Sequence, residues 1–130
     1  MPKIKQHKDL HNSPSARKRL GVKGEDEACD FLLKNGYGIV TRNFSCKIGE
    51  IDIIASKGEY LCFVEVKTRR SLKYGLPCEA VNKTKQEKIR KAAMYYWCFK
   101  TDKRLSPRFD IAEILHMDGK VYIRYMENAF

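Results

Sequence analysis

The chain has 130 residues, which is enough for one domain with a single core and leaves no room for a second. Its net charge of +10 is large for that length and indicates an acidic partner, either nucleic acid or an anionic surface. No apolar run approaches the roughly 18 residues of a membrane helix, and the basic start lacks the apolar segment of a secretory signal. We therefore expect a cytoplasmic protein without a membrane span.

Five cysteines are spread along the chain without a Cys-x-x-Cys pair. That spacing excludes a zinc finger and argues against a disulfide scaffold, so we expect reduced thiols. Cys29 and Cys62 lie in amphipathic or apolar segments and are expected to be small core residues.

The first 14 residues are polar and basic and end in Asn12-Ser13-Pro14. We expect a flexible arm over residues 1–14 and a single domain over residues 15–130. Ser15 is a suitable N-cap for a first helix, which Asn35-Gly36 would end.

Two glycines interrupt the apolar pattern of this first helix, at Gly21 and Gly24. Each weakens a helix by about 1 kcal/mol relative to alanine. The sequence therefore leaves two alternatives: the helix starts only near Val22, or another segment approaches it closely enough to require a missing side chain.

The remaining pattern predicts five strands and a second helix. The strands are expected at residues 37–43, 50–55, 60–68, 108–116 and 120–126, and a helix capped by Asn82 at residues 82–99. Residues 60–68 are apolar on both faces, so this strand should be central and covered by helices on both sides. The order αβββαββ indicates an α/β fold in which helices flank a mixed sheet.

Three charged residues, Asp52, Glu65 and Lys67, lie inside two of these apolar strands. Unpaired charges are costly to bury, so they should be paired, metal-bound or close to solvent. If Lys57 and Gly58 are the turn residues of a hairpin, Asp52 faces Phe63 and lies on the same face as Glu65 and Lys67.

Two carboxylates and a nearby backbone carbonyl suit Mg²⁺ or Mn²⁺, which prefer oxygen ligands. We expect Asp52 and Glu65 to be metal ligands, with the carbonyl of Val66 as a third and Lys67 orienting water or stabilising developing charge. The structural alternative is a buried ion pair between Glu65 and Lys67, with Asp52 capping a turn.

Residues 49–55 (Gly-Glu-Ile-Asp-Ile-Ile-Ala) and 63–69 (Phe-Val-Glu-Val-Lys-Thr-Arg) closely resemble the bacterial YraN-type family of predicted endonucleases. That family is related to the PD-(D/E)xK nucleases and is most similar to the archaeal Holliday-junction resolvases. The resemblance includes Gly21-Val22-Lys23-Gly24-Glu25, Gly36-Tyr37 and Arg42-Asn43, and it covers roughly residues 17–126. It implies a restriction-endonuclease-like fold and a Mg²⁺-dependent (or Mn²⁺-dependent) endonuclease that cleaves DNA, including branched or structured DNA.

By the same resemblance, Glu25 on the first helix completes a catalytic set with Asp52, Glu65 and Lys67. Glu25 would also be an outer or second-metal ligand; otherwise it is a first-turn residue that complements the helix dipole. The chain has Ile51 where the superfamily motif has proline before the aspartate, a position that varies among such enzymes. Phosphate contacts are expected from Arg69, Arg70, Lys73, Lys83, Lys85 and Gln86.

Two other functions stay open at the level of sequence. One is a protein that binds nucleic acid without cleaving it, and the other is an interaction factor in DNA repair or recombination. Small structure-specific nucleases often form two-fold dimers, so a homodimer is also open. The aromatic residues suit either a core or an interface: Tyr95, Tyr96, Trp97 and Phe99.

Overall fold

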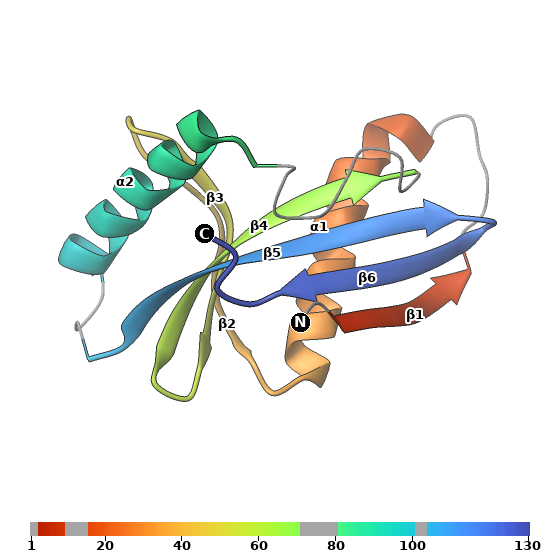
Figure 1. Cartoon of the computed structure of the whole chain (residues 1–130), viewed down its shortest axis with the longest axis horizontal. Coiled ribbons are helices and arrows are strands. Elements are labelled where there is room, and N and C mark those ends of the chain that lie inside the picture. The colour runs from red at the N-terminus through yellow and green to blue at the C-terminus, as the bar shows by residue number, and fades with distance from the viewer. Residues whose placement is uncertain (1–2, 10–15, 71–80, 101–103) are drawn as a thin grey trace.

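The computed structural model describes residues 3–9, 16–70, 81–100 and 104–130, with side chains from residue 23 onward. Two helices and six strands follow one another along the chain (Figure 1). They are β1 (Lys3–Asp9), α1 (Ala16–Lys34), β2 (Gly38–Ser45), β3 (Glu50–Lys57), β4 (Tyr60–Arg69), α2 (Lys83–Lys100), β5 (Ser106–Met117) and β6 (Lys120–Met126).

The five strands expected from sequence, β2 to β6, form one mixed sheet, and β1 adds a sixth strand at its edge. The spatial order is β1-β6-β5-β4-β3-β2. Only the β4–β5 pair is parallel, and α2 connects these two strands across a face of the sheet. The α/β class and the mixed sheet expected from sequence are confirmed.

The structure differs from the expected flexible arm at residues 1–14, because residues 3–9 form β1. This strand pairs antiparallel with β6, with Lys3 opposite Tyr125 and Lys5 opposite Ile123. Its sequence, Lys-Ile-Lys-Gln-His-Lys-Asp, contains one apolar residue and so gives no alternating pattern. A lysine-rich strand is typical of a sheet edge, where charge discourages pairing with other chains.

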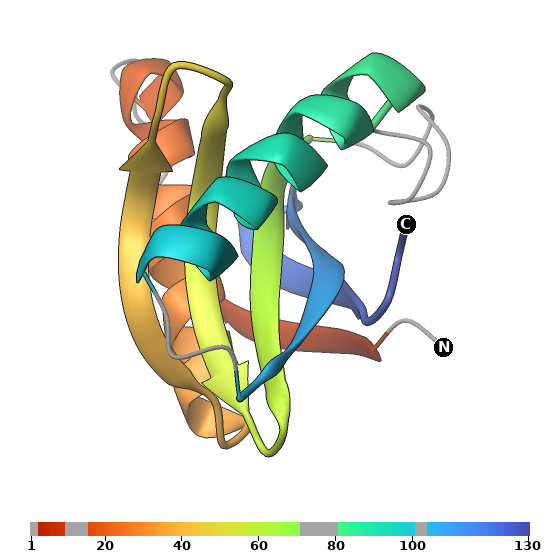
Figure 2. The same cartoon turned by 90° about the vertical axis from the view of Figure 1, so that its left-hand side faces the viewer.

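Each face of the sheet is covered by one helix, and Figure 2 shows α2 crossing one face with α1 behind the sheet. Ala28, Phe31 and Leu32 of α1 pack with one set of strand residues that includes Cys62 and Val64. On the opposite face, α2 contributes Ile89, Ala92, Ala93 and Tyr96, which pack with Leu61 and Phe63. The alternation expected along β4 is therefore confirmed, and this strand is central.

The β3–β4 hairpin has a different register from the expected one. Lys57 is opposite Tyr60, so Gly58 and Glu59 are the two turn residues, and Gly58 has a φ of 57°. The expected turn was Lys57-Gly58, which would shift the pairing by two residues. Because side chains alternate with a period of two, this shift changes the partners but keeps each side chain on its face.

Helix α1 begins at Ala16, well before Val22, and passes both glycines. A Cβ atom on Gly24 would lie 2.3 Å from Thr68 Oγ1 of β4. Gly24 is therefore the point of close approach that the sequence left as an alternative, and it brings the neighbouring Glu25 towards the end of β4. At α2, the Lys85 amide donates a hydrogen bond to Asn82 Oδ1 at 2.9 Å, as expected for an N-cap.

Candidate active site

The candidate site lies where β3 separates from β4. The paired residues of the hairpin run from Lys57–Tyr60 to Ile53–Val64 and stop there, next to Asp52 and Glu65. Beyond this point the two strands are linked by the Val66 amide, which donates a hydrogen bond to Asp52 Oδ2 at 2.8 Å. Asp52 thus links the diverging strands. The alternative in which Asp52 caps a turn does not describe this contact.

Glu65 is the buried centre of the cluster, with its side chain 4% exposed. Its Oε2 atom lies 3.6 Å from Lys67 Nζ and 3.2 Å from Lys85 Nζ. Lys67 follows Glu65 along β4, whereas Lys85 comes from the first turn of α2. The closer ammonium therefore belongs to Lys85, which was expected to contact phosphate and which the resemblance to nucleases also placed near the site, without a partner being named.

Burial and, after it, the nearby charge of Asp52 raise the pKa of Glu65 to about 7, even though Lys85 and Lys67 act in the opposite direction. The two lysines therefore offset only part of the cost of burying this carboxylate beside another one. The ion pair between Glu65 and Lys67 is present, as the structural alternative required, but it forms part of a larger cluster of like and unlike charges.

Glu25 reaches this cluster from α1. Burial raises its pKa, as does the charge of Asp52, while Arg42 on β2 lowers it. Arg42 Nη2 lies 3.7 Å from Glu25 Oε1 and donates a hydrogen bond to Asp26 Oδ1 at 2.8 Å. Arg42 was noted in sequence only as part of a motif, and its role in holding the acidic middle of α1 against β2 was missed.

The residues at this site fit a divalent cation in their donor chemistry. Asp52 and Glu65 converge from adjacent strands, and the pKa of Glu65 is raised first by burial and then by the charge of Asp52. Within residues 23–70, 81–100 and 104–130, no group of three or more His, Cys, Asp or Glu side chains is close enough to form a complete metal site. Two protein carboxylates with water as the remaining ligand suit Mg²⁺, which keeps several waters when bound.

The residues expected to contact phosphate have different surroundings. Arg69 is an exception to that expectation: its Nε lies 2.6 Å from Glu113 Oε2, and its side chain is only 9% exposed. The buried Glu113 also accepts hydrogen bonds from Arg124, so Arg69 belongs to a structural ion cluster. Gln86 is partly buried and donates to the Val81 carbonyl oxygen at 2.9 Å.

Arg70, Lys83 and Lys85 are exposed and remain available for such contacts, whereas Lys73 lies outside the described residues.

Among the aromatic residues of α2, Tyr96 belongs to the core, Trp97 is partly buried, and Tyr95 and Phe99 are exposed. The described cysteines Cys29, Cys46, Cys62 and Cys98 are free, and Cys29 and Cys62 are buried as expected.

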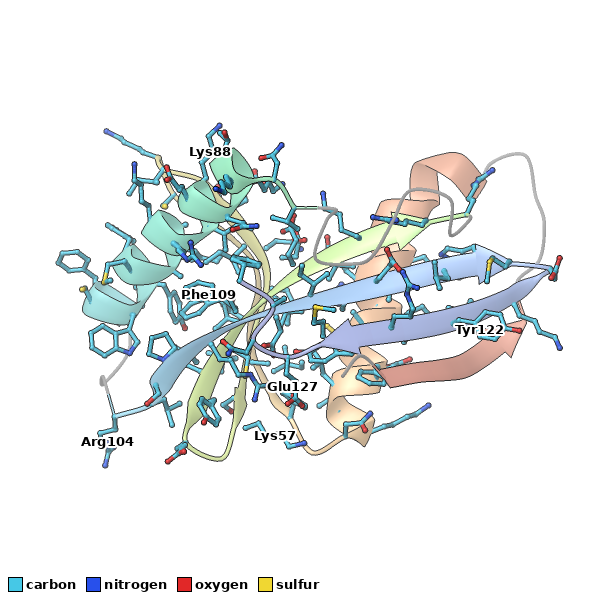
Figure 3. All side chains as sticks on the ribbon, in the orientation of Figure 1. Lys57, Lys88, Arg104, Phe109, Tyr122 and Glu127 are labelled. Carbon is cyan, nitrogen blue, oxygen red and sulfur yellow. The ribbon has the colours of Figure 1, made fainter. Side chains whose placement is uncertain are left out.

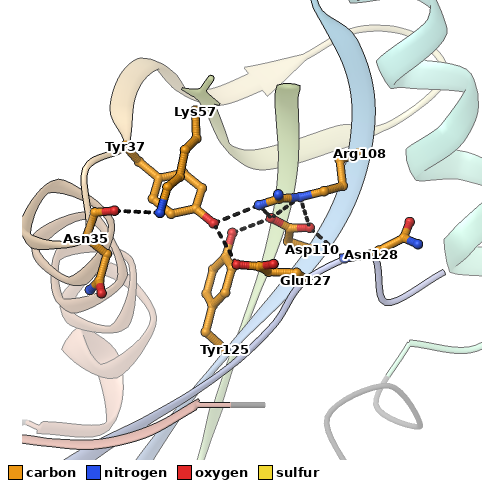
Figure 4. A network of polar contacts seen from close by, with 8 residues as sticks. All are labelled: Asn35, Tyr37, Lys57, Arg108, Asp110, Tyr125, Glu127 and Asn128. Atoms are coloured by element: carbon orange, nitrogen blue, oxygen red, sulfur yellow. Dashed lines mark hydrogen bonds and ion pairs between the residues drawn. The ribbon is translucent and has the colours of Figure 1, made fainter. Parts of the chain in front are cut away.

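A second buried acid, Asp110 on β5, shows what a purely structural carboxylate looks like here (Figure 4). It accepts hydrogen bonds from the Arg108 guanidinium, from Tyr125 Oη at 2.6 Å and from the Asn128 amide at 2.9 Å. Both oxygens are satisfied by fixed donors. Glu65, by contrast, faces two flexible ammonium groups and a second carboxylate, an arrangement that solvent or a ligand can reorganise.

The chain belongs to the uncharacterised protein family UPF0102, whose model matches residues 24–114. A UPF0102 protein of Caldicellulosiruptor bescii is 52% identical over 118 residues, covering 87% of this chain and 98% of the relative. Similar proteins in Dictyoglomus thermophilum and Caldicellulosiruptor saccharolyticus are 49% and 46% identical, over 87% and 88% of this chain and 98% of each relative. No helix in the described part of the chain is long and apolar enough to cross a membrane.

Proposed function

We propose that this protein is a Mg²⁺-dependent endonuclease of restriction-endonuclease-like fold that hydrolyses phosphodiester bonds in DNA. The observation that carries the proposal is the convergence of Asp52, Glu65 and Lys67 where β3 leaves β4. Carboxylates and an amine in one half-buried site are the groups that metal-assisted phosphodiester hydrolysis requires.

Asp52 and Glu65 would hold the cation, with the Val66 carbonyl as a third ligand and Glu25 as an outer or second-metal ligand. When bound, Mg²⁺ supplies a Lewis acid and an activated water. Lys67 is 32% exposed, so its ammonium can reach both Glu65 and a bound substrate. We assign it the roles of orienting water and stabilising charge on the phosphate oxygens in the transition state.

The charge distribution supports DNA as the substrate. On α2, the exposed residues Lys83, Lys85, Lys88, Arg90 and Lys91 extend from the carboxylates along the helix. Exposed cations of this kind bind phosphates without reading sequence. We therefore propose recognition of DNA by backbone and shape, with branched or otherwise structured DNA as the substrate class.

The test is a cleavage panel with the full chain, linear duplex and four-way-junction DNA, and Mg²⁺, Mn²⁺ or chelator. We expect cleavage that needs the cation, that Asp52→Ala and Glu65→Gln abolish, and that Lys67→Ala slows about 10²- to 10³-fold. Glu59→Gln is the matched control, because Glu59 is an exposed acid at the opposite end of the same hairpin. Circular dichroism melts establish that each variant is folded.

Every other outcome contradicts the proposal in a recognisable way. Binding to DNA without cleavage under any metal condition would identify a non-catalytic nucleic-acid-binding protein. Weak association that is insensitive to salt and to the kind of nucleic acid would identify a protein-interaction factor. Cleavage unaffected by Asp52→Ala would place any activity at another site or in a contaminant.

A further inference from the structure

A second feature of the α2 side is an apolar cavity of about 310 Å³ between the middle of α2 and the start of β5. Its lining residues are Arg90, Ala93, Met94, Trp97, Pro107 and Phe109. Figure 3 labels Phe109, which lies between α2 and β5. The cavity is open to solvent on the α2 side, where Met94 is 60% exposed.

The walls of this cavity are held rigidly by contacts outside it. The Trp97 indole donates a hydrogen bond to the Leu105 carbonyl oxygen at 3.0 Å. The Phe109 ring stacks on Phe63 on one side and on Phe130 on the other, with centroid distances of 5.6 and 5.4 Å. A ligand would therefore enter an aromatic site that needs little reorganisation.

A cation lies at the mouth of the cavity. The Arg90 guanidinium is 5.8 Å from the centre of the Phe109 ring and 5.6 Å from that of Phe130. The exposed Lys83 precedes Arg90 by about two turns on the same face of α2, so the approach to the cavity along this helix is basic. An apolar, aromatic cavity with a cationic border is complementary to a planar ring attached to a phosphate chain.

The cavity is close to the candidate active site. Phe63, which stacks on Phe109, precedes Glu65 by two residues on the same face of β4, a spacing of about 7 Å. In a duplex each strand advances about 3.4 Å per nucleotide, so a strand at the carboxylates could reach the cavity within a few nucleotides. A paired base is stacked and cannot enter such a cavity, whereas an unpaired base can.

We infer that this cavity binds one unpaired nucleobase of the DNA strand whose backbone follows α2. The inference rests on the proposed function, because it takes the ligand to be nucleic acid, and it predicts a preference for branched or single-stranded segments over plain duplex. The base stacks on the Trp97 indole, because the Phe109 ring is already stacked on Phe63 and Phe130, and its phosphates lie on the α2 cations, as in other sites that bind single strands.

The chain has a single tryptophan, Trp97, so its fluorescence reports on this cavity alone. The full chain is titrated in chelator with an eight-nucleotide thymidine strand, with the same strand carrying abasic sites, and with an eight-base-pair duplex. We expect the thymidine strand to quench Trp97, and the abasic strand and the duplex to bind without comparable quenching. Because chelator prevents cleavage, a loss of this signal and a loss of nuclease activity are separate results.

Met94→Asp should weaken binding of the thymidine strand about tenfold, within the range for one stacked base. The matched control is Phe99→Asp, which adds the same charge to α2 at a side chain that is 72% exposed and lies outside the cavity. Equal effects of the two variants, or equal quenching by the abasic strand, would overturn the inference. So would a change in Trp97 emission that depends on protein concentration without DNA, which would indicate a second copy of the chain in the cavity.

Discussion

Glu65 is the most deeply buried acid of the candidate site, and its burial and pKa determine how stability depends on pH. Two observations distinguish it: it is almost fully buried, and its pKa is raised to about 7 by burial and by Asp52. A raised carboxyl pKa means that the folded state holds the proton more tightly than the unfolded chain. The contribution of Glu65 to stability is therefore fully present below its ordinary pKa of 4.5 and is lost as the pH rises from there to about 7.

The direction of this pH dependence gives a prediction for Glu65→Gln, which keeps the shape of the side chain and removes its charge. A shift from 4.5 to about 7 corresponds to roughly 3 kcal/mol as an upper bound. Relative to the wild type, the variant should gain up to about this free energy of unfolding between pH 5 and pH 8. Urea unfolding in chelator at the two pH values measures it, with Glu59→Gln as the control. A difference between variant and wild type that does not change with pH would contradict the raised pKa.

The sequence indicated which residues belong to the candidate site, but it did not indicate which of them contact one another. The charges of Asp52, Glu65 and Lys67 stood out inside apolar strands, and the period of two kept their faces correct even though the turn was misplaced. Lys85 could not be assigned to Glu65, because a contact between α2 and β4 depends on how the helix lies across the sheet. Arg69 was taken as a phosphate contact because nothing local to it indicated its partner Glu113, which follows 44 residues later on β5.

At the scale of elements, the contact between α1 and β4 positions one side of the site. Gly24 allows this contact, since a Cβ atom there would lie 2.3 Å from Thr68 Oγ1. The pattern of apolar residues predicted the helix, and the glycine indicated a close neighbour. The identity of that neighbour required the packing itself.

Gly24→Ala tests this contact. In a free helix the change would be favourable by about 1 kcal/mol, but overpacking against Thr68 should lower the free energy of unfolding by about 1 kcal/mol overall. In a Thr68→Ala background the same change should be neutral or stabilising. A double-mutant cycle by urea unfolding measures this coupling, and additive effects of the two changes would show that the close approach is not limiting.

At the scale of the whole molecule, a charge of +10 acts together with a fold that brings Asp52 and Glu65 beside a basic helix. Cations on α2 should give DNA binding that falls steeply with salt, because each phosphate contact releases a counterion. Composition alone predicted an acidic partner. The basic helix was also predicted from sequence, but its position beside the carboxylates could be seen only in the folded chain.

A salt titration tests this arrangement. Replacing Lys83 and Lys88 with alanine should reduce the slope of log affinity against log salt by about two for linear duplex DNA in chelator. The control is the double variant Lys34→Ala, Lys120→Ala, which removes the same charge from the end of α1 and the start of β6. Equal reductions in the two double variants would mean that overall charge, and not α2, governs binding.

The position of β1 has a consequence for the order of assembly. Lys3 is paired with Tyr125, so the two strands of this contact are separated by almost the whole sequence. During synthesis β1 leaves the ribosome first but has no partner until β6 emerges, and closing so long a loop is entropically unfavourable. We therefore expect strands β2–β6 and both helices to assemble first, leaving β1 to dock last on β6 and to detach first under mild denaturation.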